Sequence, residues 1–97
     1  MTDLLTASAT VVTHSPDRYA KQLASHLGRR CEIREDVDGI RIMVGTGECL
    51  VRTHDDILQL DASAPDATSL DTVTDVIGRH LERFGQRNEL IVSWVHR

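Results

Sequence analysis

The stretch CEIREDVDGIRIMVGTGECLVRTHDDILQLDAS, residues 31–63, decides the fold of this 97-residue chain. Aliphatic and polar residues alternate along most of it, which is typical of strands with one buried face. Turn-forming pairs interrupt the alternation at Asp38-Gly39, at Thr46-Gly47 and at Asp55-Asp56. The stretch therefore predicts a meander of four antiparallel strands joined by three hairpins.

The alternation also predicts how these strands pair, because a slip of one residue would move the apolar side chains of a strand to the opposite face. With a two-residue loop or a near variant at each turn, Arg34 faces Arg41 and Arg41 faces Arg52. Arg52 in turn faces Gln59. One face of all four strands is then apolar, with rows of Ile33, Ile42, Val51 and Leu60, and of Cys31, Val44, Cys49 and Ala62.

Two helices are predicted on either side of the meander. Apolar residues at helical spacing, with a proline at the start and a glycine after the end, predict one helix from Pro16 to Leu27. A second apolar stripe predicts a helix from Asp66 to Gly85. Gly78 lies inside this second helix, where glycine costs about 1 kcal/mol relative to alanine. We therefore expect close packing against a neighbouring segment at Gly78.

Residues 6–14 and 89–96 are the remaining predicted strands, since both are rich in β-branched residues. The element order is then β-α-β-β-β-β-α-β. Because strand direction reverses at each hairpin, both helices can cover one face of a largely antiparallel sheet. The sequence predicts an α+β two-layer sandwich in a single domain over residues 1–97. It leaves open whether the first and last strands pair with each other or extend the meander.

Composition excludes several functions. The chain has 11 Lys plus Arg against 15 Asp plus Glu, a net charge of −4, which argues against a nucleic-acid binder that relies on bulk charge. One Trp, one Tyr and one Phe are too few for a base-stacking platform. No stretch approaches the ~18 apolar residues of a membrane span, and the first residues lack the pattern of a signal peptide. We expect a cytoplasmic protein that binds neither nucleic acid nor membranes.

The two cysteines, Cys31 and Cys49, are expected to be free thiols. In the predicted register they lie on the same buried face two strands apart, which is ~9.6 Å at the usual strand spacing. This exceeds the ~7 Å that a disulfide spans between Cα atoms. The chain has no CxxC or HxxxH motif, so the sequence predicts no metal site and no cofactor.

The predicted register lines up three arginines across the open face of the sheet, with Gln59 at the end of the row. Like charges on facing strands destabilise a sheet by about 0.2–1 kcal/mol per pair. Guanidinium groups match carboxylates and phosphates, so one hypothesis is a shallow site for an anionic small molecule bearing a carboxylate, phosphate or catecholate. Its residues are Arg34, Arg41, Arg52 and Gln59. The alternative is that Glu32, Asp36 and Asp61 neutralise the row as ordinary solvated surface.

His26 and His80 are the candidate functional histidines. Each lies at the margin of the apolar stripe of its helix, so each is expected to be half-buried. Half-buried histidines can serve as acid–base groups or as metal ligands. Because antiparallel helices would hold these two residues at opposite ends, we expect the rings not to meet. Each is then held by a hydrogen bond to a backbone carbonyl or a nearby aspartate.

Residues spread over the whole chain resemble the DUF2218 family, a bacterial domain of unknown function. The most specific part is the run His80-Leu81-Glu82-Arg83-Phe84 followed ten residues later by Trp94. The other residues are Arg18-Tyr19, Gln22-Leu23 and His26, Gly45 with Gly47, and Ala64 with Asp66. The resemblance implies a small cytoplasmic protein, often encoded beside or fused to a siderophore-interacting flavin reductase. It therefore implies a role in iron acquisition.

Three functional hypotheses follow. The first is a non-enzymatic binding or accessory domain in iron-siderophore metabolism, whose partner is a siderophore-interacting flavin reductase or an anionic small molecule. The second is a small enzyme that uses His80. The third is a structural module that forms a homodimer through the open face or the last strand. The sequence assigns no catalytic residue.

Overall fold

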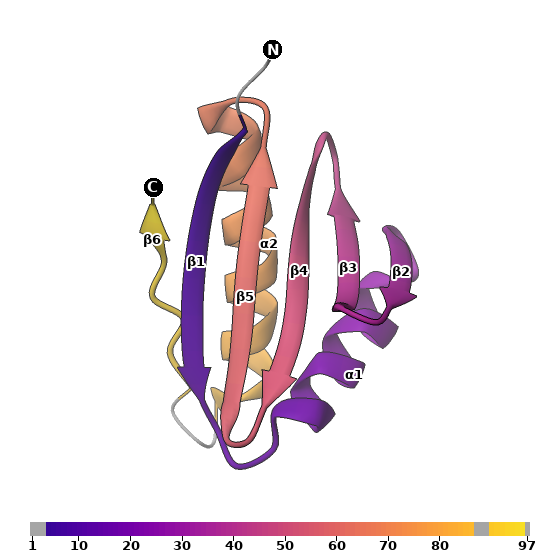
Figure 1. The fold of residues 1–97 in the computed structure, drawn as a ribbon, viewed down its shortest axis with the longest axis vertical. Coiled ribbons are helices and arrows are strands. Elements are labelled where there is room, and N and C mark those ends of the chain that lie inside the picture. Colours follow the sequence, from indigo (N-terminus) through magenta and orange to yellow (C-terminus); the bar gives the residue numbers. More distant parts are fainter. Residues whose placement is uncertain (1–3, 87–89, 97) are drawn as a thin grey trace.

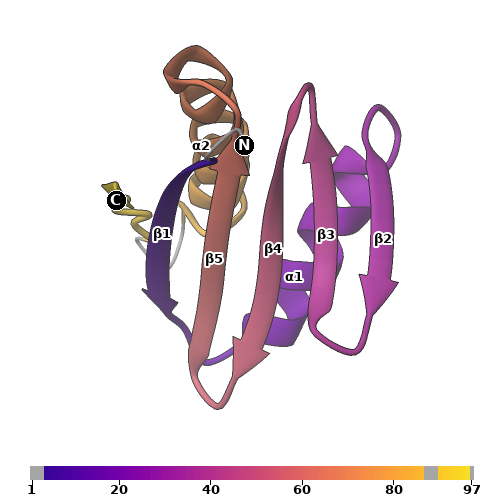
Figure 2. The same ribbon diagram turned by 45° about the horizontal axis from the view of Figure 1, so that its top comes forward.

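Six strands form one antiparallel sheet in the order β2-β3-β4-β5-β1-β6, and both helices pack on the same face of it (Figure 1). The structure is a computed structural model that describes residues 4–86 and 90–96. Figure 2 shows the strands side by side in front of the helices, with their other face uncovered. The predicted α+β two-layer sandwich is confirmed. Its elements are β1 (Leu5–Val12), α1 (Pro16–Leu27), β2 (Glu32–Asp36), β3 (Gly39–Val44), β4 (Gly47–His54), β5 (Ile57–Ala64), α2 (Ala67–Phe84) and β6 (Val95–His96).

The four-strand meander is confirmed, with one correction to its register. Arg34 pairs with Arg41, and Arg52 pairs with Gln59, as predicted. Arg41, however, pairs with Leu50 and not with Arg52. The register of β3 against β4 thus differs from the prediction by two residues. A shift of two keeps every side chain on its predicted face, so the apolar face survives the error.

Two glycines explain why the middle hairpin turns one residue earlier than predicted. Gly45 has φ +59°, the left-handed conformation that a tight hairpin loop requires. Gly47 already belongs to β4, where it lies tightly under α2. A Cβ atom there would come within 2.6 Å of Val73 Cγ2 and 2.7 Å of the Ser63 carbonyl oxygen. The loop is therefore Gly45-Thr46, and Gly47 is kept small by packing.

The first strand extends the meander, which resolves the question that the sequence left open. β1 pairs with β5 over its whole length and carries β6 on its other side. The predicted strand over residues 89–96 is mostly wrong, because among the described residues of that stretch only Val95 and His96 pair, with Ser8 and Ala7. Residue 89 lies outside the described residues.

Contacts with α2 hold residues 90–94 away from a sheet conformation. The backbone N–H of Val92 donates to the carboxylate of Glu82 at 3.0 Å. Trp94 packs on Gly78, where a Cβ atom would lie 3.2 Å from the indole Nε1. The close neighbour expected at Gly78 is therefore confirmed, and it is the C-terminal segment.

The hydrophobic core lies between the two helices and the inner face of the sheet. Apart from Phe84 at the end of α2, which is half-buried, each helix buries the stripe predicted from its spacing. Burying one leucine or isoleucine side chain contributes about 1.5–3 kcal/mol. This packing holds the helices, and the residues between them, in fixed positions against the sheet. Neither described helix is long and apolar enough to cross a membrane. The buried stripes are Tyr19, Ala20, Leu23 and Leu27 in α1, and Leu70, Val73, Ile77 and Leu81 in α2.

Asp66 caps the N-terminus of α2, and its replacement has a predictable effect. Its carboxylate accepts a hydrogen bond from the Ser69 N–H at 2.7 Å, which lowers the pKa of Asp66 below its usual range. A lowered pKa stabilises the fold above the unfolded-state value of about 3.9 and stops doing so as the pH falls through the folded-state value. We expect Asp66→Ala to lower the melting temperature at pH 7, and Asp66→Asn, which keeps an acceptor, to lower it less. Thermal unfolding from pH 7 down to pH 2 checks this, and an Asp66→Ala deficit that stays constant over the whole range would contradict it.

Candidate functional site

The predicted arginines lie on the outer face of the sheet, the face opposite the helices, but they do not form one row. Arg34 and Arg41 face each other directly. The corrected register separates Arg41 from Arg52, since Leu50 stands opposite Arg41. The charge repulsion expected along a row of three is thus confined to one pair.

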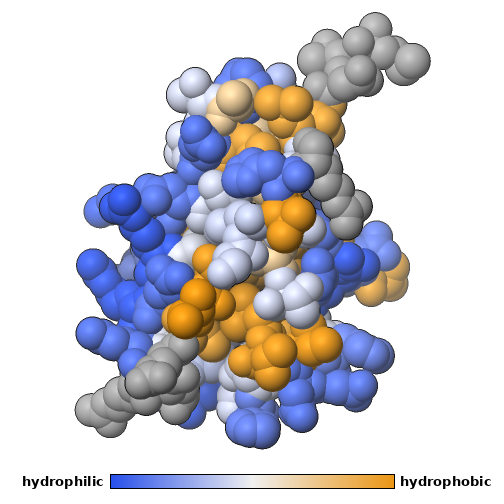
Figure 3. Space-filling model, turned by 90° about the vertical axis from the view of Figure 1, so that its left-hand side faces the viewer, coloured by the Kyte–Doolittle hydropathy of each residue, from blue (hydrophilic) through white to orange (hydrophobic). Residues whose placement is uncertain are grey.

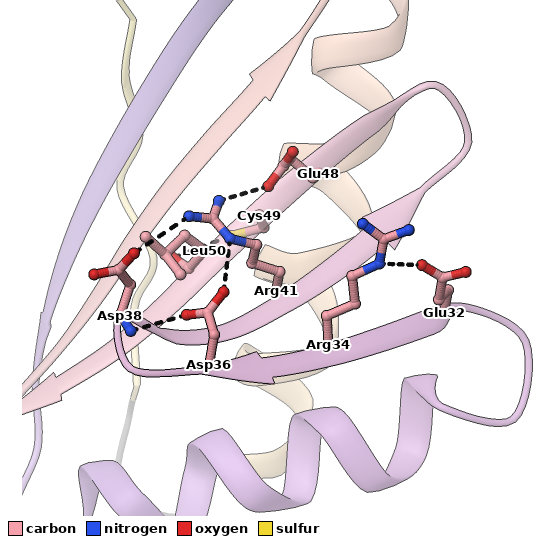
Figure 4. Close-up of polar contacts among 8 residues, drawn as sticks. All are labelled: Glu32, Arg34, Asp36, Asp38, Arg41, Glu48, Cys49 and Leu50. Atoms are coloured by element: carbon pink, nitrogen blue, oxygen red, sulfur yellow. Dashed lines mark hydrogen bonds and ion pairs between the residues drawn. The ribbon is translucent and has the colours of Figure 1, made fainter.

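Arg41 is surrounded by carboxylates (Figure 4). Its guanidinium group lies 2.9 Å from Glu48, 3.3 Å from Asp36 and 3.8 Å from Asp38. The hydrogen bond with Glu48, followed by that with Asp36, raises the pKa of Arg41 above its ordinary value. The backbone N–H of Asp38 is the main reason that the pKa of Asp36 is lowered. The positive charge of Arg41 is therefore balanced without any ligand.

The other residues of the predicted anion site also have partners. Arg34 pairs with Glu32, and Arg52 lies 2.5 Å from Asp61. Gln59 donates to Asp61 at 3.3 Å and accepts from the Thr10 hydroxyl at 2.7 Å. An anion would have to compete with these carboxylates at an exposed surface, where ion pairs contribute only about 0–1 kcal/mol each. Ligand binding by Arg34, Arg41, Arg52 and Gln59 stays a prediction.

The two candidate histidines are in contact, which corrects the expectation that they stay apart. The ring centroids of His26 and His80 are 5.1 Å apart. Phe84 lies edge-on to both rings, with centroid distances of 5.4 Å to His26 and 6.2 Å to His80. Three residues that carry the family resemblance therefore meet between α1 and α2.

Helix geometry explains this contact. α1 and α2 run in opposite directions (Figure 1), and α1 has 12 residues against 18 in α2. The last turn of α1 therefore lies beside α2 and not beyond its end. Each Cα–Cβ bond leans toward the N-terminus of its own helix, so side chains on opposed helices lean toward each other. His26 and His80 meet for this reason.

A backbone carbonyl orients the His80 ring, as expected. Nδ1 of His80 lies 2.6 Å from the Val76 carbonyl oxygen. Because a carbonyl only accepts, Nδ1 must carry the hydrogen. In the neutral ring the lone pair is then on Nε2, which makes this nitrogen the available acceptor or base. His80 is half-buried, as expected. His26 is exposed, because it lies in the last turn of α1, and the expectation that it is half-buried is therefore wrong.

A cavity of about 420 Å³ opens beside the two rings, between the end of α1, the loop that follows it, β3 and α2. None of its lining residues in the described part of the chain carries a carboxylate. Arg29 and Arg30 do, and neither forms an ion pair within the described part of the chain. We call it the histidine cavity; its lining is His26, Leu27, Arg29, Arg30, Cys31, Val44, Val76 and His80.

The sequence alone did not assign Arg29, Arg30 or Cys31 to a site. Their position could have indicated it, because they follow closely after the helix that ends with His26 and Leu27. Their contrast with the outer-face arginines depends on which carboxylates are within reach, and only the structure shows this. Within residues 4–86 and 90–96 no three His, Cys, Asp or Glu side chains come together to hold a metal ion.

Both cysteines are free thiols, as predicted, but they differ in environment. Cys49 is fully buried, and this burial raises the pKa of its thiol to about 12. Cys31 is half-buried and lines the histidine cavity. Because the thiolate is the reactive form, we expect a thiol reagent at pH 8 to modify Cys31 and leave Cys49 untouched in the folded protein. Mass spectrometry after brief labelling checks this, with Cys31→Ser as the control; modification of that variant at the wild-type rate would contradict it.

Comparison with solved structures finds the same fold in the NMR structure of PA4090 from Pseudomonas aeruginosa. The TM-score is 0.77 at 26% sequence identity, and the match covers 94% of this chain and 95% of that one. No curated protein matches the sequence. The family model for DUF2218, described as an uncharacterized protein conserved in bacteria, matches residues 8–95. Because this match spans nearly the whole fold, including the strands and helices that form the histidine cavity, the chain belongs to the DUF2218 family.

Proposed function

We propose that this protein is a small-molecule binding domain whose site is the histidine cavity, and that its ligand is an anion with an apolar body. The observation that carries the proposal is the lining of the cavity as residues 4–86 and 90–96 form it. It has two guanidinium groups without ion-pair partners among these residues, two imidazole rings and no carboxylate. Such a lining favours negative charge. A ligand is expected to supply the negative charge that this lining does not contain.

The contrast with the outer face supports this choice of site. Arg34, Arg41 and Arg52 each have a carboxylate partner, so an anion gains little by approaching them. Arg29 and Arg30 have none in the part of the chain that the structure describes, so an anion gains a charge-assisted hydrogen bond there without displacing a partner. Arginine side chains therefore favour anion binding in the histidine cavity but not on the outer face of the sheet.

The cavity also offers apolar surface for the rest of the ligand. Leu27, Val44 and Val76 contribute to the lining. Ligand sites commonly combine such apolar walls with a few polar groups that orient the ligand. An aromatic or branched carboxylate fits this combination better than a bare inorganic ion.

The family resemblance supports a narrower proposal, that the ligand or partner belongs to iron-siderophore metabolism and that the domain is accessory to a siderophore-interacting flavin reductase. Guanidinium groups donate hydrogen bonds to anionic oxygens, which catecholates carry as well as carboxylates. A small aryl carboxylate, a catechol carboxylate and ferric siderophores therefore form the appropriate test panel.

The test is an NMR titration of the ¹⁵N-labelled protein with benzoate, 2,3-dihydroxybenzoate, ferric siderophores and a flavin reductase. We expect at least one of the small anions to shift the amide signals of residues 26–31 and 76–84. Shifts centred on Arg34, Arg41 and Arg52 would move the site to the outer face. No shift with any small anion would overturn the binding proposal, and no shift with ferric siderophores or reductase would overturn the narrower one.

A small enzyme that uses His80 is the second candidate. The observation in its favour is the hydrogen bond from Nδ1 to the Val76 carbonyl, which leaves Nε2 as a base. The two candidates differ in the fate of the ligand. A binding domain returns every bound compound unchanged, whereas an enzyme converts at least one of them, which NMR of the ligand detects.

The homodimer also stays a proposal, and one surface supports it. Figure 3 shows apolar side chains gathered on the side of the molecule that carries β1 and the C-terminal segment. Val12 is 76% exposed there, Ile91 70% and Val95 63%. Neither β1 nor residues 90–95 contain a charged residue, so two copies could meet at this edge without like-charge repulsion. Light scattering at several concentrations tests this; a constant monomer mass would exclude it.

A further inference from the structure

We propose that the histidine cavity takes up a proton together with its anionic ligand, so that the ligand binds more tightly as the pH falls. The inference rests on the proposed function, because it concerns the same site. It adds a pH dependence to ligand binding at that site. Binding that does not depend on pH would overturn this inference without overturning the binding site.

The two rings create the coupling. With centroids 5.1 Å apart, protonating either imidazole of His26 and His80 affects the other. An anion beside the rings is attracted when either ring carries a positive charge, and more strongly near a protein surface than in bulk water.

The other groups that line the cavity add positive charge. From the loop after α1, Arg29 and Arg30 add two further positive charges to the lining, and Cys31 adds a thiol. α2 contributes Val76 and the edge of Phe84, and β3 contributes Val44, none of which is charged. The charged residues of α2 beside this segment, Asp75, Arg79 and Glu82, line a different cavity. Within the described residues the lining of the histidine cavity contains no negative charge, so an anion supplies it. The anion favours the protonated rings over the neutral ones, and by linkage a proton strengthens anion binding.

The atom that takes the proton is defined at His80. Its Nδ1 already carries a hydrogen that is donated to the Val76 carbonyl at 2.6 Å. An added proton therefore goes to Nε2. This nitrogen changes from an acceptor into a donor, which is the form that can hydrogen-bond an anion.

The size of the effect follows from linkage. Uptake of one full proton changes an affinity by at most about ten-fold per pH unit. Unperturbed imidazole groups change charge between about pH 5 and 8, which is why the affinities are compared within this range. We expect benzoate, whose charge is constant above about pH 6 because carboxyl groups titrate near 4, to bind at least about three-fold more tightly at pH 6.0 than at pH 7.5.

The experiment is calorimetric titration of the full chain with benzoate at both pH values, in pairs of buffers with different ionisation enthalpies. The difference between buffers counts the protons taken up. The variant His26→Gln/His80→Gln is expected to bind with no pH dependence. The control is His54→Gln, which removes an exposed histidine of β4 on the far side of the sheet and is expected to keep the wild-type pH dependence.

Ring signals of the unmodified protein provide a second readout that does not depend on the double variant folding. Adding benzoate at constant pH 7 is expected to move the His26 or His80 ring nitrogens toward the imidazolium position. Benzoate binding with equal affinity at both pH values and no proton uptake overturns this inference and leaves the binding site standing. Failure of benzoate to bind at either pH overturns the inference, and if the other small anions also fail to bind, it overturns the proposed function with it.

Discussion

Replacing Gly47 with alanine is expected to lower the free energy of unfolding by about 1–3 kcal/mol, and replacing it with valine by more. A Cβ atom at this position would lie 2.6 Å from Val73 Cγ2, 2.7 Å from the Ser63 carbonyl oxygen and 3.0 Å from the Ala64 Cβ. The Ser63 oxygen belongs to the backbone of β5, so it cannot move without disturbing the pairing of β4 with β5. Urea denaturation of both variants measures the loss.

Gly45 offers the matched control for Gly47. It lies two residues away in the same hairpin, has φ +59°, and has nothing within 4 Å of an added Cβ atom. Asparagine tolerates the left-handed conformation, so Gly45→Asn is expected to stay close to wild-type stability. A Gly47→Ala variant as stable as Gly45→Asn would show that α2 does not pack on the middle hairpin as described.

Removing the positive charge of the histidine cavity is expected to reduce its affinity for benzoate at least about ten-fold, because hydrogen bonds to charged groups contribute about 1.5–3 kcal/mol. The variant is Arg29→Gln/Arg30→Gln, whose side chains are exposed and make no ion pair within the described residues. We therefore expect its thermal stability to stay near that of the wild type. Calorimetry or NMR titration at pH 6 and low salt gives the affinity.

The control for this variant changes the net charge equally on the other face of the sheet. Arg34→Gln/Arg52→Gln removes two guanidinium groups that already have carboxylate partners. It is expected to change the affinity for benzoate by less than about two-fold, since charges farther apart than about 10 Å are screened in 0.1 M salt. An equal loss in both double variants would mean that overall charge, and not the histidine cavity, attracts the anion.

The sequence predicted the layers of this fold because period-2 and period-3.6 patterns are local. Alternation identified the meander, and the stripes of Leu23 and Ile77 identified the helices and their buried faces. The predicted position of the middle hairpin loop was wrong because both Gly45 and Gly47 suit a turn. Only the approach of Val73 from α2 distinguishes them, and this contact joins distant parts of the chain.

The same limit applies to the candidate site. The sequence singled out His26 and His80 as candidates, and whether they belong to a site stays a prediction. Their contact could not be predicted because it depends on how the two helices overlap. The outer-face arginines were predicted from their spacing along the strands. This spacing shows that they share a face, but it does not show which carboxylates neutralise them. The pairs of Arg41 with Glu48 and of Arg52 with Asp61 come from neighbouring strands in the final register. Arg29 and Arg30, which have no ion-pair partner among the described residues, lie in a loop without any periodic pattern.

The central claim, that the cavity between α1 and α2 holds an anion, is tested most directly by the side-chain signals of the wild-type protein during titration with the aryl carboxylates benzoate and 2,3-dihydroxybenzoate at pH 6. We predict that at least one of them shifts the ring signals of His26 and His80 and the guanidinium signals of Arg29 and Arg30 together, with one dissociation constant. The signals of Arg34 and Arg52 are predicted to stay in place. Saturable shifts at Arg34 and Arg52 with unchanged His26 and His80 rings would contradict the claim.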